Sequence, residues 1–403
     1  MTPKERMLRA LRGERPDAVP AAPCYLSLFL ADLERAAYVE QYRRCLNGRS
    51  RLRVDHAQDT HFRAEALYHS YDLFKERPDW IEVHAGASRA WADRTEIVLH
   101  EGVLCYEDQT SGVRLPMHAA PLPAGDAPVS AMAASRQDVW DLSAQFLGPD
   151  DVDAATPILG AEQWLARGDL DLPRQVLADH GSTFFVQTIL DTPFSEAYDW
   201  LGFQGLMLLQ HDRPAVLHRL LERRLEQSRE TLRAWAQVGV PGIFVEEVFT
   251  GADAISPRSY DEFVFAYNQP YFQHLHSLGL LSIHYVCGNA IPRLERMVAC
   301  GVSAVAVEES KKNFQLELDE VVGRVAGRAA VFGNIDAVHF GLHATAEEIR
   351  AEVERQAGIG ARARGFVVST GSPFPLDTDP RRIDALVAAA HTLSPGVPGD
   401  RTS

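Results

Sequence analysis

Gly242-Ile243-Phe244-Val245-Glu246-Glu247-Val248 is a short apolar run that ends in two carboxylates, and the segments on either side of it show which fold it belongs to. Before it, residues 213–238 carry leucines at helical spacing, and after it a helix start at Ser256-Pro257 leads to a second apolar run at residues 280–286. A strand, a helix and another strand in this order predict a βαβ unit with parallel strands. Since the runs contain almost no charge, we expect both faces of each strand to be buried.

The same alternation extends outward over nearly the whole chain. Eight apolar runs occur, at residues 18–25, 80–84, 183–189, 242–248, 280–286, 303–307, 329–333 and 365–369. Eight βα units close into a (β/α)8 barrel, whereas an open doubly wound sheet has a glycine-rich first turn, and neither G-x-G-x-x-G nor G-x-x-x-x-G-K-[ST] occurs here. We therefore predict an α/β fold, a (β/α)8 TIM barrel that spans residues 1–393 as one domain and is followed by a flexible tail at 394–403. Residues 95–100, 102–106 and 112–115 predict a hairpin insertion between the second and third strands.

Composition and charge exclude several classes of partner. The 403 residues include 40 Lys and Arg against 55 Asp and Glu, a net charge of −15. This balance argues against a nucleic-acid surface and, more mildly, against a polyanionic substrate. Five scattered cysteines differ from a secreted disulfide framework, so we expect reduced thiols and a cytoplasmic protein. No apolar stretch approaches the ~18 residues of a membrane span, so we expect no membrane partner.

Polar residues gather where the predicted strands end. In barrel enzymes the chemistry lies at the carboxyl ends of the strands and in the loops that follow them. Burying so many carboxylates, an imidazole and a thiol without partners would cost free energy, so a functional cavity is the economical explanation. The residues at these ends include Gln187, Glu246, Glu247, His284, Tyr285, Cys287, Asn289, Glu308, Glu309, Asn334, Asp336 and Ser372.

The most informative of these strand ends has the sequence Ile283-His284-Tyr285-Val286-Cys287-Gly288-Asn289. An imidazole and a thiol, with Glu308 or Glu309 one βα unit later, are ligand types that suit Zn²⁺. In a regular strand, residues three apart face opposite sides, so the site requires that the strand bend or end between His284 and Cys287. The alternative is a buried cysteine beside a histidine that hydrogen-bonds a neighbouring strand.

The polar residues at the ends of two other predicted strands also allow two interpretations each. Glu246 and Glu247 are adjacent, so only one of them can face the barrel interior while the other meets a helix. Asp336 is a candidate acid or base, and it is equally typical of the N-cap of a following helix. The candidate catalytic residues are therefore Glu246, His284 and Asp336.

Five segments together carry a family resemblance. They are residues 4–11 with 16–20, residues 255–263, residues 284–289, residues 332–336 and residues 369–373. In this order they resemble the uroporphyrinogen decarboxylase superfamily, and most closely its corrinoid-dependent methyltransferase branch, of the methylcobalamin:coenzyme M type. The resemblance implies a (β/α)8 barrel and a zinc ion held by a His-x-Cys pair on the fifth strand and a Cys after the last strand. The matching positions here are His284, Cys287 and the residue after Gly371. The zinc would activate a thiol acceptor, and the methyl group would come from a corrinoid on a separate protein.

Several features depart from this pattern. The spacing between His284 and Cys287 is one residue longer than in the family, and the last Cys is Ser372. A Glu at the end of the sixth strand completes the zinc set in the similar zinc-dependent methionine synthases, which points to Glu308 or Glu309. The decarboxylase branch has an Arg-rich segment after the first strand, where this chain has no Arg between residues 24 and 30. No D-x-H-x-x-G corrinoid-binding sequence occurs, so any corrinoid would arrive on a partner protein.

Three hypotheses follow for the function. The leading one is a methyltransferase-like enzyme that moves a methyl group between a small methylated compound or a corrinoid and a thiol or similar acceptor, with zinc held by His284, Cys287 and Glu308 or Glu309. The second is a metal-free decarboxylase or lyase acting on a small carboxylic acid, and the third is a non-catalytic barrel that carries a corrinoid or tetrapyrrole. Barrels of this kind often self-associate, so a homodimer is also expected. The residues expected to bind substrate are Gln187, Tyr285, Asn289, Asn334 and Ser372.

Overall fold

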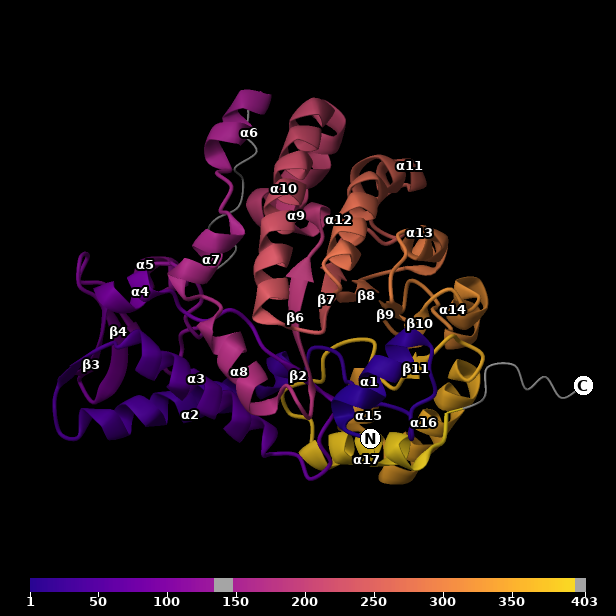
Figure 1. The fold of residues 1–403 in the computed structure, drawn as a ribbon, viewed down its shortest axis with the longest axis horizontal. Coiled ribbons are helices and arrows are strands. Elements are labelled where there is room, and N and C mark those ends of the chain that lie inside the picture. The colour runs from indigo at the N-terminus through magenta and orange to yellow at the C-terminus, as the bar shows by residue number, and fades with distance from the viewer. Residues whose placement is uncertain (134–147, 396–403) are drawn as a thin grey trace, which may run out of the picture.

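Seven parallel strands form the central sheet of the computed structural model, which describes residues 1–133 and 148–395. The strand order is β11-β10-β9-β8-β7-β6-β2, so strands that follow one another in this sheet are neighbours in space (Figure 1). The strands are β2 (Trp80–Glu82), β6 (Phe185–Asp191), β7 (Gly242–Glu247), β8 (Leu281–Val286), β9 (Ala304–Val307), β10 (Ala330–Phe332) and β11 (Phe366–Val367). Of the expected tail, residues 396–403 lie outside the described residues.

Residues near Ala21 take the eighth position and close the barrel. Ala21 forms a parallel bridge with Val368, and the Ala22 N–H donates to the Val368 carbonyl over 2.8 Å. On the other side the Asp79 N–H donates to the Ala21 carbonyl, also over 2.8 Å. The predicted first strand at residues 18–25 is therefore shortened to a bridge, because the backbone turns at Tyr25 (φ 51°). The predicted α/β barrel is confirmed.

Side chains alternate along each strand between the barrel interior and the helix layer, as the two-residue period of a strand requires. Interior side chains form one buried cluster, which includes Trp80, Phe185, Phe244, Ile283, Tyr285 and Phe332. Side chains on the outer face of the strands join a second cluster with the helices, which includes Ile81, Val186, Ile243, Val245, Val286 and Val305. This alternation decides which polar side chain at a strand end faces the interior.

Helices surround the sheet (Figure 1). Those before β6 are α2 (Leu26–Leu46), α3 (His56–Tyr71), α4 (Arg89–Arg94), α5 (Val129–Ala133), α6 (Pro149–Ala155), α7 (Ala161–Arg167) and α8 (Asp171–His180). Those after β6 are α9 (Pro193–Asp212), α10 (Pro214–Val238), α11 (Pro257–Ser259), the π-helix η3 (Tyr260–Phe265), α12 (Ala266–Ser277), the 3-10 helix η4 (Ile291–Arg293), α13 (Leu294–Ala299), α14 (Leu318–Val325), α15 (Ala337–Leu342), α16 (Ala346–Gly360) and α17 (Pro380–Thr392). No helix among them, within the described ranges, is long and apolar enough to cross a membrane.

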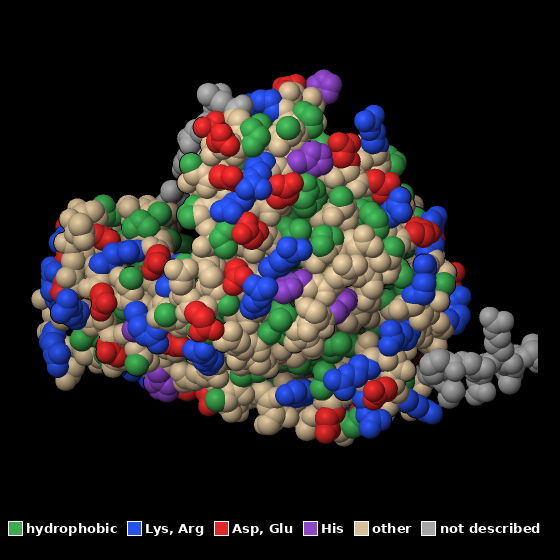
Figure 2. Space-filling model, turned by 45° about the horizontal axis from the view of Figure 1, so that its top comes forward, with side chains coloured by type: hydrophobic (Ala, Val, Ile, Leu, Met, Phe, Trp, Pro, Cys, Tyr) green, Lys and Arg blue, Asp and Glu red, His purple; other side chains and the backbone are tan. Residues whose placement is uncertain are grey.

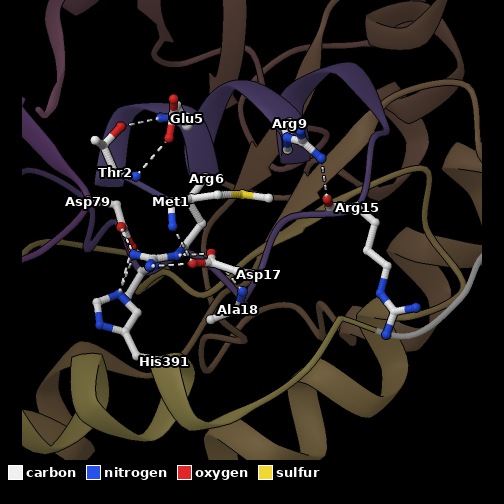
Figure 3. Close-up of polar contacts among 11 residues, drawn as sticks. Met1, Thr2, Glu5, Arg6, Arg9, Arg15, Asp17, Ala18, Asp79 and His391 are labelled. Carbon is white, nitrogen blue, oxygen red and sulfur yellow. Dashed lines mark hydrogen bonds and ion pairs between the residues drawn. The ribbon is translucent and has the colours of Figure 1, made fainter. Parts of the chain in front are cut away.

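Helix α1 (Pro3–Arg12) closes the amino-terminal end of the barrel. Its Met7, Ala10 and Leu11 belong to the interior cluster. Arg6, on the same helix, forms ion pairs with Asp17 and with the buried Asp79 (Figure 3). Asp79 also accepts the Ala21 N–H over 2.7 Å and lies 2.8 Å from His391 Nε2 of α17, so this carboxylate connects both ends of the chain to the start of β2.

A four-stranded antiparallel sheet contains the three strands that follow β2, at the residues where the hairpin insertion was expected, and one strand that precedes β2. It has the order β1-β3-β4-β5, with β1 (Arg51–Arg53), β3 (Thr95–His100), β4 (Val103–Asp108) and β5 (Arg114–Pro116). The sheet and helices α2 and α3 share a separate apolar cluster, so this part forms a lobe beside the barrel (Figure 1). On the face drawn in Figure 2, Lys and Arg side chains are interspersed with Asp and Glu.

Candidate active site

Strand β7 resolves which of its two terminal carboxylates faces inward. Phe244 lies in the interior cluster and Val245 in the outer one. By alternation Glu246 points toward the barrel interior and Glu247 toward the helices. Glu246 is half-buried, whereas Glu247 is fully buried.

The same alternation on β8 separates His284 from Cys287. Ile283 and Tyr285 lie in the interior cluster with Cys287 packed against it, while Val286 joins the outer cluster. His284 is fully buried on the outer side, where its ring packs 4.7 Å from that of Phe272 on α12. This corrects the expectation that His284 and Cys287 face the same cavity, because the strand continues to Val286 without the bend that such convergence requires.

His284 instead belongs to a buried polar network behind the barrel. Its Nε2 lies 3.0 Å from Glu247 Oε2, and Asn268 of α12 donates to the same oxygen. The Thr250 hydroxyl donates to Glu247 Oε1 over 2.6 Å. Burial opposes ionisation of Glu247, but His284, Thr250 and Asn268 together outweigh it and hold the pKa of this carboxyl below its usual range. The network fixes the end of β7 rather than contacting the interior.

Cys287 presents a thiol at the carboxyl end of the barrel. The side chain is half-buried, and the turn after it places Gly288 at φ 88° with its N–H donating to Glu308 Oε2 over 3.0 Å. Burial, together with the carboxylates of Glu246 and Glu308, raises the pKa of the Cys287 thiol well above its ordinary value. Burial also raises the pKa of Glu308. The three groups therefore form one electrostatically coupled set.

Three further residues of this mouth were missed by the sequence analysis: Cys24, Tyr25 and Glu82. Cys24 and Tyr25 belong to the interior cluster, and burial followed by the carboxylate of Glu82 raises the pKa of the Cys24 thiol well above its ordinary value. Glu82 is 1% exposed at the end of β2, and burial raises its pKa to about 7. A signal was present, because Glu82 stands two residues after Trp80 in a run otherwise free of charge.

The loop after β11 approaches the loop after β9 at the same mouth. Ser372 Oγ donates to Glu309 Oε1 over 2.7 Å, and Lys311 forms an ion pair with the same carboxylate. Tyr285 Oη donates to the Gly371 carbonyl over 2.8 Å. A Cβ on Gly371 would overlap the backbone of Glu309, so the approach of the two loops requires glycine here.

The remaining residues that were predicted to be catalytic or to bind substrate either form hydrogen bonds that hold the loops in place or line the barrel interior. Asp336 Oδ1 accepts the N–H groups of Val338 and His339, so its carboxylate is the N-cap of α15. Asn334 Nδ2 donates to the carbonyls of Glu308 and Leu316, which secures the loop after β9. The Asn289 N–H donates to Asp253 over 2.7 Å. Gln187 of β6 is fully buried and points inward between Phe185 and Ile189.

The predicted zinc ligands do not assemble. Within residues 1–133 and 148–395, no group of three or more His, Cys, Asp or Glu side chains is arranged to hold a metal ion. By strand alternation, the inward position two residues before Cys287 is Tyr285, and the position after Gly371 is Ser372. Phenol and hydroxyl groups are poor ligands for this ion compared with imidazole and thiolate. The donor set of this site therefore does not fit a catalytic zinc, which corrects the expected set of His284, Cys287, Glu308 and Glu309.

Comparisons with known proteins agree with this architecture. A family model described as "Uroporphyrinogen decarboxylase (URO-D)" matches residues 181–393, more than half of the 403 residues. A protein of Rhodococcus opacus (strain B4) named uroporphyrinogen decarboxylase is 30% identical over 188 residues, which cover 46% of this chain and 51% of that protein. One of Aliivibrio salmonicida (strain LFI1238), with the same name, is 26% identical over 204 residues, which cover 48% and 53%. The chain thus spans about half the length of the curated relatives it matches.

A solved structure extends the likeness to the whole fold. A methyltransferase from Methanosarcina mazei has a TM-score of 0.65 and 19% identity, covering 97% of this chain and 98% of that one. At this identity the likeness establishes the shared barrel architecture alone. Since the family model matches more than half of the chain, the expected family relationship is confirmed: the chain belongs to the uroporphyrinogen decarboxylase (URO-D) family.

Proposed function

We propose that the protein is an enzyme that transfers a methyl group between a small methylated compound, or a corrinoid supplied by a partner protein, and a thiol or similar acceptor. The reaction takes place at the carboxyl end of the barrel. The observation that carries the proposal is the half-buried Cys287 thiol, which faces inward beside Glu246 and Glu308. Members of the family share this barrel, and chemistry at the carboxyl ends of its strands is the rule for barrel enzymes.

The carboxylates supply the proton transfer that such a reaction needs. A thiol or hydroxyl acceptor must lose its proton before it attacks a methyl carbon, and a carboxylate beside it can serve as the base; burial raises the pKa of Glu308, which makes it a stronger base for that step. In this scheme Glu246 or Glu308 takes the proton, the bond between acceptor and methyl forms, and the donor keeps the electron pair of its broken bond. Cys287 contacts the reacting groups, and the scheme requires no metal.

Decarboxylation of a polycarboxylate is disfavoured by charge. A substrate with several carboxylates needs cationic partners, and residues 24–30 after the first barrel position contain no Arg. Glu82, Glu246 and Glu308 would instead repel it. The names of the sequence relatives therefore do not by themselves decide the reaction of this chain.

The test is an anaerobic assay with methylcobalamin and a panel of small thiols, followed through the visible absorbance of the corrinoid. We expect turnover that falls by about a hundredfold in Glu246→Gln. Cys287→Ser should lose turnover as well, whereas Cys45→Ser, a cysteine of α2 outside the barrel, serves as the matched control and should retain it. Carbon dioxide release from small carboxylic acids that depends on Cys287, without methyl transfer, would refute the proposal.

A further inference from the structure

Buried polar atoms without partners mark the inside of the barrel mouth. Both amide atoms of Gln187 lack a hydrogen-bond partner although the residue is 0% exposed. Glu82 Oε1 and Glu309 Oε2 are likewise buried and unpartnered, at 1% and 5% exposure of their residues. Proteins rarely leave several such groups unsatisfied in one place. Gln187 lies within β6 opposite Glu82 at the end of β2, and Glu309 follows β9, so these unpartnered atoms indicate a space inside the barrel that a polar ligand completes.

The charge of this space is negative. Glu82, Glu246 and Glu308 contribute carboxylates, while Lys311 is already paired with Glu309. These carboxylates also act on the two thiols of the mouth: after burial, Glu82 and Glu246 raise the pKa of Cys24, and Glu246 and Glu308 raise the pKa of Cys287. An anionic ligand would add to this repulsion, whereas a cation would relieve it.

Aromatic rings form the floor beneath the carboxylates. Tyr25, Phe244 and Tyr285 contact one another, with ring centroids 5.4–5.5 Å apart. All three belong to the interior cluster; Phe244 lies two residues before Glu246 and Tyr285 two residues before Cys287, while Tyr25 precedes α2. Aromatic rings together with carboxylates are the usual surroundings of bound alkylammonium groups, because the ring faces carry partial negative charge and tolerate methyl groups.

We infer that the barrel mouth binds a small organic cation that carries methyl groups, such as a methylated ammonium or sulfonium compound. This inference rests on the proposed function and names its substrate class. Gln187 provides one donor and one acceptor for a second polar group of the ligand. When the acceptor thiol takes the methyl group, its sulfur–carbon bond forms, the bond between the methyl group and the donor's nitrogen or sulfur breaks, and the donor keeps the electron pair and becomes neutral. The thiol proton passes to the carboxylate base, so the donor product carries no positive charge and is held less strongly.

The test compares a cation with its neutral isostere. Calorimetric titration of the full chain with choline and with 3,3-dimethylbutan-1-ol, which replaces the nitrogen by carbon, should give binding of choline that is about tenfold or more tighter. Glu308→Gln and Glu82→Gln should each weaken choline binding about tenfold, whereas Glu65→Gln on the exposed face of α3 should leave it unchanged. Circular dichroism establishes that each variant is folded.

Defined outcomes would overturn the inference. Equal affinity for the two isosteres, preference for a small carboxylic acid, or choline binding that survives both carboxylate substitutions would each contradict it, as would the absence of binding by choline and tetramethylammonium alike. Different results would reject the inference and the proposed function. Methyl transfer from neutral donors without cation binding rejects the inference alone, and cation binding without any methyl transfer rejects the proposed function alone.

Discussion

At the scale of single residues, one step along a strand separates a site residue from a structural one. Tyr285 donates to the loop carbonyl of Gly371 inside the barrel, while His284 lies 3.0 Å from Glu247 in the helix layer. The sequence shows an imidazole and a thiol close together, but it does not show where the strand ends. Because β8 remains regular to Val286, alternation decides the outcome and places Tyr285 rather than His284 on the side of Cys287.

This alternation predicts how a zinc site could be restored. The double variant Tyr285→His, Ser372→Cys should bind about one zinc ion per chain together with Cys287, since three inward N and S ligands suit a tetrahedral ion with one open position. The same double variant with Cys287→Ala is the control and should lose the metal. Elemental analysis after dialysis measures the stoichiometry. Zinc in the unmodified protein that disappears in His284→Ala would contradict this assignment.

At the scale of elements, Glu82 joins the end of β2 to the first turn of α2. Its Oε2 accepts the Ser27 N–H over 2.8 Å, while Oε1 is buried without a hydrogen-bond partner. Cys24 and Tyr71 are the titratable neighbours, and burial raises the pKa of both well above the ordinary values, so they stay uncharged near neutrality. Glu82 is therefore the group of this set whose charge changes near pH 7.

The pKa of Glu82, about 7, predicts a pH dependence for cation binding. Below this pH the carboxyl is protonated and attraction for a cation is lost, whereas above it the carboxylate is already ionised and attracts the cation without loss of a proton. Choline affinity should thus rise with pH and level off above about pH 7. In Glu82→Gln, choline affinity should change less with pH and should stay near the value that the unmodified protein has at low pH. An affinity that falls with rising pH would contradict the role of this carboxylate.

The elements themselves were largely predictable, and the exceptions have physical causes. Seven of the apolar runs became strands of the parallel sheet because they are short and nearly free of charge. The first run, at residues 18–25, became a bridge at Ala21, since a turn at Tyr25 starts α2 at Leu26. The signal at Glu82, one carboxylate in a run otherwise free of charge, is weaker than that of the other strand ends, because no thiol or second carboxylate adjoins it.

At the scale of the whole molecule, both ends of the chain meet at the buried carboxylate of Asp79. Arg6 from α1 and His391 from α17 reach it from opposite termini (Figure 3). The Ala21 N–H also donates to it. A charge without solvent exposure is tolerated only when paired and hydrogen-bonded. This carboxylate therefore stabilises the closed barrel at the end opposite the candidate site.

Because Asp79 lies at the end of the barrel opposite the candidate site, removing one of its partners should lower the stability of the fold without affecting ligand binding. Arg6→Ala removes one partner of a fully buried carboxylate, so the free energy of unfolding should fall by about 2 to 4 kcal/mol. Arg9→Ala, on the exposed side of the same helix, removes only a hydrogen bond to the Arg15 carbonyl and should change stability by less than about 0.5 kcal/mol. Urea denaturation measures the free energy of unfolding of both variants.

Under conditions in which it is folded, Arg6→Ala should still bind choline normally, because the carboxylates of the mouth lie at the other end of the strands. Lost binding in a folded Arg6→Ala protein would show that the two ends are coupled.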